Sequence, residues 1–292
     1  MKKLFLIAAA VLALGSVTAD AAAFRLCTGT NSLNYNKAGH ILKKNSQSVA
    51  IEVIETKGSL DNLDKLSKNE CDGAFVQSDA MLVYSSKNAK AISGMERAGI
   101  LYQEQVHMVC NRKLDLGRMV NLNKSHTVAV GPDGSGGRTT WDGFVLADKA
   151  RYSPVNTDSR SGVRAMAAVA EGTQVQCALV VTALNSSLMK NDAQKEGDNV
   201  VLVGTDDRDM TKTAKDGRGQ PVYTYGEIPA GTYPKIQPTG AVYGTKAIGT
   251  IQVDAIFVAN TDWINNNERD YDTLLRSFGS AKPEIAKLAQ PQ

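Results

Sequence analysis

The chain has 292 residues, a formal net charge of +3, 42% hydrophobic residues and 22% charged residues, which are ordinary values for a globular protein. No basic block and no stripe of basic and aromatic residues occurs, so the usual nucleic-acid-binding surfaces are excluded. Low-complexity tracts and repeats at solenoid spacing are also missing from the sequence, which excludes repeat architectures.

Residues 1–23 have the pattern of a secretory signal peptide. Lys2 and Lys3 precede an apolar stretch at residues 4–14, and small residues follow up to Phe24. This stretch is too short to span a bilayer, and no later segment reaches roughly twenty unbroken apolar residues. We therefore expect cleavage after residue 23 and export of a soluble mature chain to a bacterial periplasm.

Strands and helices alternate in the first part of the mature chain. The pattern predicts a strand at residues 24–30, a helix at 34–46, a strand at 48–56, a helix at 59–70 and a short buried strand at 73–78. Leu60, Leu63 and Leu66 should share one face of the second helix. The segment EQVHMVCNR, at 104–112, should be a strand that enters a second unit.

The same alternation begins again after residue 125. The predicted order is a strand at 126–132, a helix at 136–150, a strand at 151–157, a helix at 161–172 and a strand at 175–183. The expected inward residues of the second of these helices are Val163, Met166, Ala167 and Ala170. Strands at 199–204 and 253–260 and a closing helix at 273–289 follow. Two βαβαβ units predict two α/β domains with largely parallel sheets.

Each unit has a turn rich in glycine, serine and threonine at the end of its first strand, TGTNSLNY at 28–35 and GPDGSGGRTT at 131–140. Ligands of open α/β sheets bind at such places, because helix N-termini present free N–H groups and a partial positive charge. One turn in each domain predicts a cleft that closes on a small carboxylate. For any single glycine among Gly134, Gly136 and Gly137, a tight turn without a ligand is the alternative.

Three enzyme motifs can be tested against the second turn, and each is incomplete. A P-loop requires a lysine after its second glycine, but Gly137 and Arg138 follow Gly136. A nucleophile elbow requires a glycine where Asp133 stands, two residues before Ser135, and a dinucleotide motif requires a third glycine in place of Thr139. The histidines stand in no recognisable triad context, so we expect neither an enzyme nor a cofactor.

The four cysteines, Cys27, Cys71, Cys110 and Cys177, all lie in the mature chain. An even number in an oxidising compartment favours disulfides, with three possible pairings. Zinc binding is the alternative, but there is no CxxC motif, and the sequence distance to the cysteines is large for His40, His107 and His126.

Several segments together resemble the TAXI group of periplasmic solute receptors, which serve tripartite TRAP transporters. They are TGTNSLNYNKAG, GSLDNLDKLSKNECDGAFVQSDA, LYQEQVHMV, VAVGPDGSGGRTT and, as the most specific, IPAGTYP at 228–234. The resemblance covers nearly all of the mature chain. It implies a type II periplasmic-binding-protein fold, in which crossing hinge strands join two α/β domains, with domain 1 at residues 24–104 and 207–292 and domain 2 at 105–206.

The resemblance also implies a function. The protein would be a monomer that captures glutamate, glutamine or a related organic acid and delivers it to a TRAP-type membrane permease. A sensory or orphan binding protein that feeds a signalling partner is the alternative. An enzyme would require a titrating residue set in the cleft, for which the sequence offers no convincing candidate.

Ligand-binding residues follow from the resemblance by position. The first-domain set is Thr30, Asn31, Ser32, Tyr35, Gln77 and Ser78, and the second-domain set is Ser135, Gly136, Gly137, Arg138, Thr139 and Thr182. Backbone N–H groups of the Ser135 turn would donate to a ligand carboxylate, and Arg138 would add a charge-assisted bond. The implied fold also places the cysteines in neighbouring strands as the pairs Cys27–Cys71 and Cys110–Cys177, one bridge in each domain.

Overall fold

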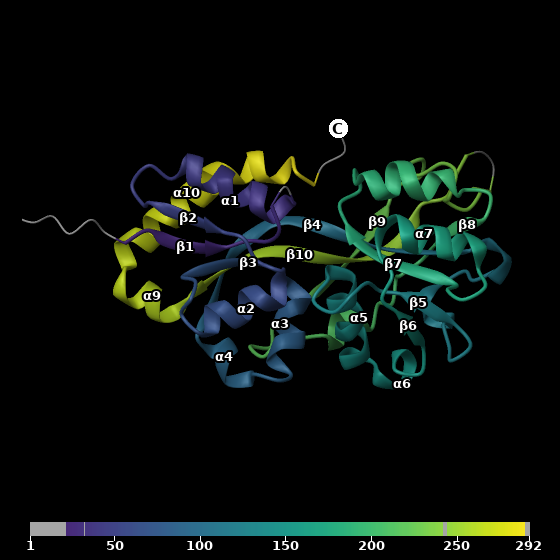
Figure 1. Cartoon of the computed structure of the whole chain (residues 1–292), viewed down its shortest axis with the longest axis horizontal. Helices are drawn as coiled ribbons and strands as arrows, with labels where there is room; N and C mark the ends of the chain where they lie inside the picture. The colour runs from purple at the N-terminus through teal and green to yellow at the C-terminus, as the bar shows by residue number, and fades with distance from the viewer. Residues whose placement is uncertain (1–21, 32, 242–243, 290–292) are drawn as a thin grey trace, which may run out of the picture.

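The computed structural model describes residues 22–289 apart from residues 32, 242 and 243, so residues 1–21 of the expected signal peptide lie outside the described residues. Two α/β lobes lie side by side, as Figure 1 shows. They share one sheet in the order β2-β1-β3-β10-β4-β7-β5-β6, with β8 on β4 and β9 on β10. The first lobe lies at the β2 end of this order and the second lobe at the β6 end.

The first lobe takes its elements from both ends of the described chain. They are β1 (Phe24–Cys27), α1 (Asn34–Asn45), β2 (Ile51–Ile54), α2 (Ser59–Ser67), β3 (Gly73–Gln77), α3 (Ser78–Ser85), α4 (Ala89–Ser93), α9 (Thr261–Asn266) and α10 (Glu268–Ala286). Strand β1 pairs in parallel with β2 and with β3. One face of the sheet packs on α1 and α10 through Leu42, Phe257 and Leu274, and the other face buries Leu63 and Leu66 of α2.

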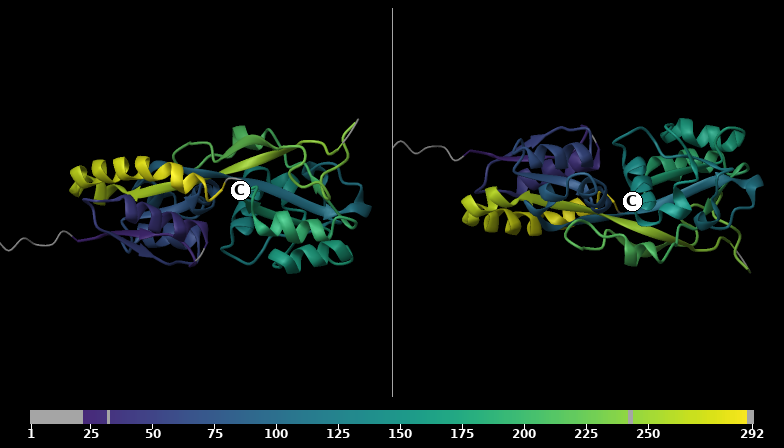
Figure 2. Two further views of the ribbon diagram at one scale, coloured as in Figure 1. Left: turned by 90° about the horizontal axis from the view of Figure 1, so that it is seen from above. Right: turned by 90° about the horizontal axis from the view of Figure 1, so that it is seen from below.

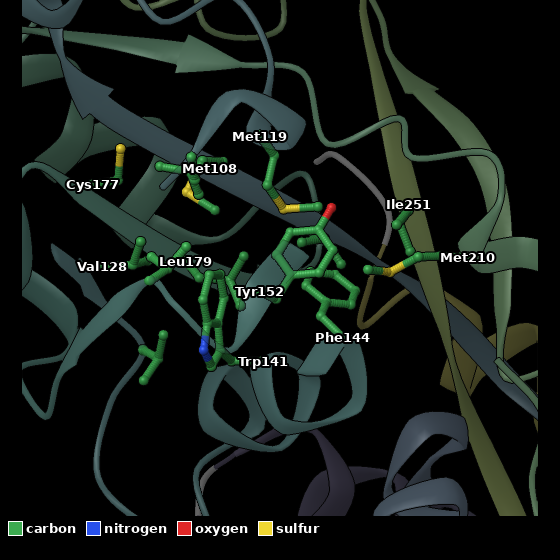
Figure 3. Close-up of a cluster of buried hydrophobic side chains, with 14 of the residues drawn as sticks. Met108, Met119, Val128, Trp141, Phe144, Tyr152, Cys177, Leu179, Met210 and Ile251 are labelled. Carbon is green, nitrogen blue, oxygen red and sulfur yellow. The ribbon is translucent and has the colours of Figure 1, made fainter. Parts of the chain in front are cut away.

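The second lobe is built mainly from the middle of the chain. Its elements are η1 (Arg112–Leu114), η2 (Met119–Asn121), β5 (Thr127–Ala129), α5 (Gly136–Ala147), α6 (Lys149–Tyr152), β6 (Asn156–Asp158), α7 (Gly162–Glu171), β7 (Cys177–Thr182), the π-helix η3 (Leu188–Ala193), β8 (Val200–Val203), α8 (Met210–Thr213) and β9 (Tyr223–Ile228). Figure 3 shows the core on the α5 side, where Trp141, Phe144 and Tyr152 point toward Met108 and Leu179.

Two long antiparallel strands join the lobes. They are β4 (Met95–Asn111) and β10 (Ile248–Asn260), and both views of Figure 2 show them running from one lobe into the other. The sequence predicts only the second half of β4. The first half lacks a clear strand pattern in the sequence, because a register shift beside Ile100 and Tyr102 interrupts the alternation of inward and outward side chains.

The segment that follows β9 packs on the second lobe. Ile228, Tyr233 and Ile236 are buried together with Met166 and Val169 of α7. The domain boundary near residue 207 stays a prediction. These contacts show that the side chains after β9 pack against the second lobe.

The disulfide pairing implied by the resemblance is confirmed. Cys27 bonds to Cys71 in the first lobe, and Cys110 bonds to Cys177 in the second. Cys110 and Cys177 are direct partners in the antiparallel pair of β4 and β7. The bridges span sequence separations of 44 and 67 residues, and loop entropy predicts that each stabilises the fold by about 4 kcal/mol.

Two predictions about the second lobe are wrong. Residues 151–157 do not form a strand, because the Asp148 side chain accepts a hydrogen bond from the Arg151 N–H at 3.1 Å and caps the short helix α6. Only Asn156–Asp158 is a strand. The inward face of α7 is also rotated from the expected one: Val163 is 59% exposed, and Ala167 is exposed as well.

The cause of the second error is the composition of α7. Apolar residues occupy most of its positions, so periodicity does not define a single face. The residues that pack on the sheet are Ala165, Met166, Ala168 and Val169.

Candidate functional site

The second-lobe turn, residues 130–137, ends in a capped helix N-terminus. Ser135 is the N-cap residue of α5, and its Oγ accepts a hydrogen bond from the Arg138 N–H at 3.3 Å. The N–H groups of Gly136 and Gly137 make no hydrogen bond to any residue that the structure describes. Two free donors and the positive end of the helix dipole therefore meet at this turn.

Close packing explains why two glycines follow Ser135. A Cβ on Gly137 would lie 2.8 Å from the carbonyl oxygen of Val130 and 3.0 Å from that of Leu179, so only glycine lets α5 approach the sheet this closely. A Cβ on Gly136 would lie 2.9 Å from Oε1 of Gln77, which belongs to the first lobe. The turn is therefore in contact with the opposite wall.

The first lobe presents a second helix N-terminus. Helix α1 begins at Asn34 without a side-chain cap, and the N–H groups of Asn34, Tyr35 and Asn36 have no partner among the described residues. The Tyr35 ring packs against the rings of Phe75 and Tyr102, each with centroids 6.4 Å apart. These contacts fix the first turn of α1 at the boundary between the lobes.

Glu104 lies next to these aromatic rings, on the crossing strand β4. Tyr102 and Glu104 face the same side of the sheet because they are two residues apart in a regular part of the strand. Gln77 and Tyr102 pair with Ala255 from opposite edges of β10, which places them in one row. We call Tyr35, Gln77, Tyr102 and Glu104 the first-lobe wall.

Several buried polar atoms near this boundary lack a hydrogen-bond partner within the described residues. They are the hydroxyls of Tyr35 and Tyr102, Oδ1 of Asp79, Oε1 of Gln105 and Oγ1 of Thr139. Buried polar groups are normally paired, because leaving one without a partner costs about 1–3 kcal/mol. Five such atoms on facing elements mark a polar site rather than a packed core.

The acids of this region have strongly altered pKa values. Burial and, to a smaller extent, the charge of Asp79 raise the pKa of Glu104 to about 8, against an opposing interaction with Gln77. Burial likewise raises the pKa of Asp79, and the hydrogen bond from Thr140 offsets part of this effect, so that the pKa is about 6. Burial also raises the pKa of Tyr35, which stays a neutral phenol. The site therefore holds carboxyl groups with little compensating positive charge.

The two lobes touch directly beside this site. The Thr140 hydroxyl of α5 donates to Oδ2 of Asp79 in α3 at 2.6 Å. Within the second lobe, the Tyr223 hydroxyl donates to the Thr140 carbonyl at 3.3 Å. A Cβ on Gly58 would lie 3.4 Å from the carbonyl oxygen of Gly134. The turns of the two lobes are thus in a closed arrangement.

The structure brings some of the predicted site residues together and leaves others apart. Tyr35, Gln77, Gly136 and the buried Thr139 lie at the meeting of the lobes. Thr182 is the last residue of β7 and pairs with Gln105 of β4.

The other predicted residues have different surroundings. Thr30 and Asn31 are exposed, and Ser32 lies outside the described residues. The Ser78 hydroxyl donates to the Val222 carbonyl at 2.6 Å and accepts from the Asp254 N–H at 3.1 Å, so it links three segments near the crossing strands.

Arg138 is directed away from the first lobe. It lies two residues from both Gly136 and Thr140, and therefore on the opposite side of α5 from these two contacts with the first lobe. Its Nε donates to Asp142 at 3.0 Å and lies 3.9 Å from Asp133. Its role in ligand binding stays a prediction.

Sequence reasoning missed four residues of the site, namely Asp79, Tyr102, Glu104 and Thr140. Glu104 lies inside β4, whereas ligand sites of open α/β sheets are expected at the ends of strands. An acid next to the otherwise buried run of β4 residues 105–111 was the available signal. Asp79 belongs to α3, which is buried nearly all round and therefore has no amphipathic pattern.

The segment IPAGTYP has a structural role behind the site. The ring of Tyr233 is fully buried, its hydroxyl donates to the Leu184 carbonyl at 3.0 Å, and it lies 3.0 Å from Nε2 of His107. Burial lowers the pKa of His107 to about 4, so this imidazole is neutral at pH 7. The network holds the loop after β7, directly beyond Thr182.

Two further findings limit what the described residues can do. Among them, no helix is both long and apolar enough to cross a membrane. The same residues contain no group of three histidine, cysteine, aspartate or glutamate side chains placed to hold a metal ion.

Comparison with solved structures shows what the fold is similar to. A putative sulfonate-binding protein SsuA of an ABC transporter from Methylobacillus flagellatus KT aligns with a TM-score of 0.52 and 10% identity over 90% of this chain and 68% of that one. YhfZ from Shigella flexneri aligns with a TM-score of 0.52 and 12% identity, covering 94% of each chain. The GluR0 ligand-binding core in complex with L-glutamate aligns with a TM-score of 0.52 and 12% identity, over 92% of this chain and 97% of that one. These likenesses show the fold alone.

Comparison with sequences gives the family. No curated protein matches the chain. The model of the NMT1-like family matches residues 29–267, which include both crossing strands, every described residue of the site and all elements of the two lobes except β1 and α10. The two-lobed α/β architecture is the periplasmic-binding-protein fold expected from the sequence, and the chain belongs to the NMT1-like family.

Proposed function

We propose that this protein is a periplasmic solute-binding receptor that captures a small carboxylate or amino acid between its lobes. The observation that carries the proposal is that, among the described residues, N–H groups at the starts of α5 and α1 and several buried polar atoms at the lobe boundary have no hydrogen-bond partner. Helix N-termini favour anions, and buried polar atoms require partners. A bound solute would supply both.

The mechanism of the proposal is differential binding to open and closed forms. A ligand that contacts both the first-lobe wall and the second-lobe turn stabilises the closed form by its extra affinity for that form. The closed surface is then available to a partner. We propose a TRAP-type membrane permease as this partner on the basis of the TAXI resemblance, with a signalling protein as the alternative.

The fold neighbours fit this proposal in kind. They are a putative periplasmic sulfonate-binding protein and a ligand-binding core in complex with L-glutamate. They also support the expected periplasmic location.

The carboxyl groups of Asp79 and Glu104 leave a second candidate open, because altered pKa values are also typical of acid–base catalysis. A receptor returns its ligand unchanged, whereas an enzyme converts it. Recovery of the intact ligand after prolonged incubation with the protein, measured by mass spectrometry, separates these functions.

The main test is a thermal-shift screen of ligand-stripped mature protein against amino acids, dicarboxylates, sugars and nucleotides. Binding to the folded state must raise the melting temperature by mass action. We expect a shift with one or more amino acids or small acids. A flat response to all of them, with a shift from nucleotides or sugars, would contradict the proposal.

Gly136→Pro then tests the site itself. Proline is accepted at the first position of a helix but lacks the N–H group. We expect Gly136→Pro to remove the melting shift while the unliganded protein stays folded. Gly136→Ala is the matched control, because it adds a similar Cβ next to Gln77 but keeps the donor.

A further inference from the structure

The charge balance of the site, rather than its shape, narrows the class of ligand. Glu104 forms no ion pair with any residue that the structure describes, although thirteen ion pairs occur elsewhere in these residues. Asp79 lies close enough to repel it electrostatically. Arg138, the cation expected in the cleft, pairs with Asp142 instead.

Asp79 and Glu104 differ in their exposure to solvent. Asp79 is completely buried and already accepts a hydrogen bond from Thr140. Glu104 lies among protein atoms yet stays partly exposed. A solute in the cleft therefore reaches Glu104, and Asp79 acts on it only through its charge.

The groups around Glu104 favour a donor with several hydrogens. Among the residues that the structure describes, the buried hydroxyls of Tyr35 and Tyr102 make no hydrogen bond, and Tyr102 is 6% exposed. Burial and the charge of Glu104 raise the pKa of both phenols, so their oxygens stay neutral. One carboxylate and two phenol oxygens are suitable acceptors for the three hydrogens of an ammonium group.

Taking these observations together, we propose that the cleft selects solutes that carry a protonated amine, with the Glu104 carboxylate as its counter-ion and the free N–H groups of α5 as the site for the solute carboxylate. The inference rests on the proposed function and narrows it to amino acids or similar amines. A dicarboxylate without an amine would place a negative charge against Glu104, so it requires Glu104 to stay protonated.

Amines and amine-free acids should differ in the direction of proton exchange that accompanies binding. The titratable groups that face Glu104 are Asp79 on α3, Tyr35 on α1 and Tyr102 on β4. With a pKa of about 8, Glu104 is mostly protonated at pH 7 before binding. An ammonium ligand favours the carboxylate form, so binding releases a proton to the buffer. An acid without an amine has the opposite effect, and binding takes up or retains a proton.

The experiment combines matched ligands with this linkage. The twenty L-amino acids and amine-free counterparts such as glutarate, succinate and propionate are titrated into the full mature protein by calorimetry. Buffers of different ionisation enthalpy at pH 7 report the protons exchanged. We expect at least one amino acid to bind with proton release and its amine-free counterpart to bind roughly 30-fold more weakly, which is the loss typical of a desolvated charge pair.

Glu104→Gln provides the variant arm, with Glu171→Gln, an exposed residue at the end of α7, as its control. We expect Glu104→Gln to weaken amino-acid binding about 30-fold and to abolish proton release, while Glu171→Gln changes neither.

Each contrary result has a definite meaning. Equal affinity for an amino acid and its amine-free counterpart, proton uptake, or unchanged binding by Glu104→Gln overturns the inference and leaves the receptor function standing. Absence of binding by every probe overturns both. If Glu104→Gln fails to fold, the wild-type comparison of matched ligands and protons decides alone.

Discussion

The two sides of the lobe boundary present different chemical groups. The second-lobe turn offers backbone N–H groups, held by the Ser135 cap and by the close approach of Gly137 to the sheet. The first-lobe wall offers mainly side chains, namely two phenols, an amide and the Glu104 carboxyl. A backbone wall binds any carboxylate, whereas a side-chain wall discriminates among solutes. Specificity should therefore reside in the first lobe and general anion affinity in the second.

The largest effect should follow from disturbing the backbone wall. Gly137→Val places a branched side chain against the carbonyls of Val130 and Leu179 and displaces α5. We expect the free energy of unfolding to fall by about 1–3 kcal/mol and ligand affinity to fall roughly a hundredfold, the equivalent of about one charge-assisted hydrogen bond. Chemical denaturation and calorimetry measure these changes. Gly117→Val is the control, since a Cβ there has no neighbour within 4 Å, and an equal loss in both variants would refute the packing argument.

The next effect is a dependence of stability on pH that originates in the side-chain wall. The pKa of Glu104 is raised from 4.5 to about 8, so between these values the folded protein holds a proton that the unfolded chain has released. This contribution to stability is present at low pH and is lost as the pH rises through about 8. Melting of the ligand-free protein between pH 6.5 and 8.5 should therefore show falling stability in wild type and a flatter profile in Glu104→Gln.

The chosen pH range isolates Glu104 from the other buried groups. The pKa of Asp79 is raised to about 6 and that of His107 is lowered to about 4, so their contributions change mainly below pH 6.5. Parallel slopes for the wild type and Glu104→Gln would show that the pKa of Glu104 is not raised in the folded protein.

A smaller effect should separate a ligand-binding phenol from a structural one. The Tyr35 hydroxyl has no partner among the described residues, so Tyr35→Phe should leave unfolding unchanged and weaken ligand binding about tenfold. In contrast, the Tyr152 hydroxyl donates to Asp207 at 2.8 Å in the second-lobe core. Tyr152→Phe should therefore lower stability by about 1–2 kcal/mol without changing affinity. Thermal melting and calorimetry on both variants test this. A loss of stability in Tyr35→Phe together with a loss of affinity in Tyr152→Phe would contradict both assignments.

The smallest effect is expected at Arg138. Its guanidinium pairs with Asp142 on the side of α5 away from the first lobe, and such partly exposed pairs contribute about 0–1 kcal/mol. Arg138→Ala should change ligand affinity less than about threefold, because it removes no contact with the first lobe. A tenfold loss in calorimetry would instead restore Arg138 as a ligand-binding residue.

The sequence predicts regular elements well where one face is apolar, as in α1, α2 and α10. It also indicates the glycine-rich turns, because their residue types are set by local backbone demands. The disulfide pairs follow once the strand order is assumed, since β1 and β3 are neighbours and β4 pairs with β7.

The rest depends on contacts between distant segments. Helix α3 is buried on nearly all sides and has no periodic pattern, and Pro154 lies between α6 and β6 where a continuous strand was expected. The first-lobe wall joins residues from α1, β3 and β4, with β10 between the two strands. Only the tertiary fold brings Glu104 next to Tyr35, which is why the discriminating half of the site was harder to predict than the backbone half.

The position of β10 also orders the assembly of the protein in time. This strand lies between β3 and β4 in the sheet, yet it comes from residues 248–260. A chain that emerges from its N-terminus can form β1, β2, β3 and the Cys27–Cys71 bridge early, but the first lobe must wait for β10 to close its sheet. Most of the second lobe is synthesised before that strand arrives. The lobe that discriminates among solutes should therefore be the last to mature.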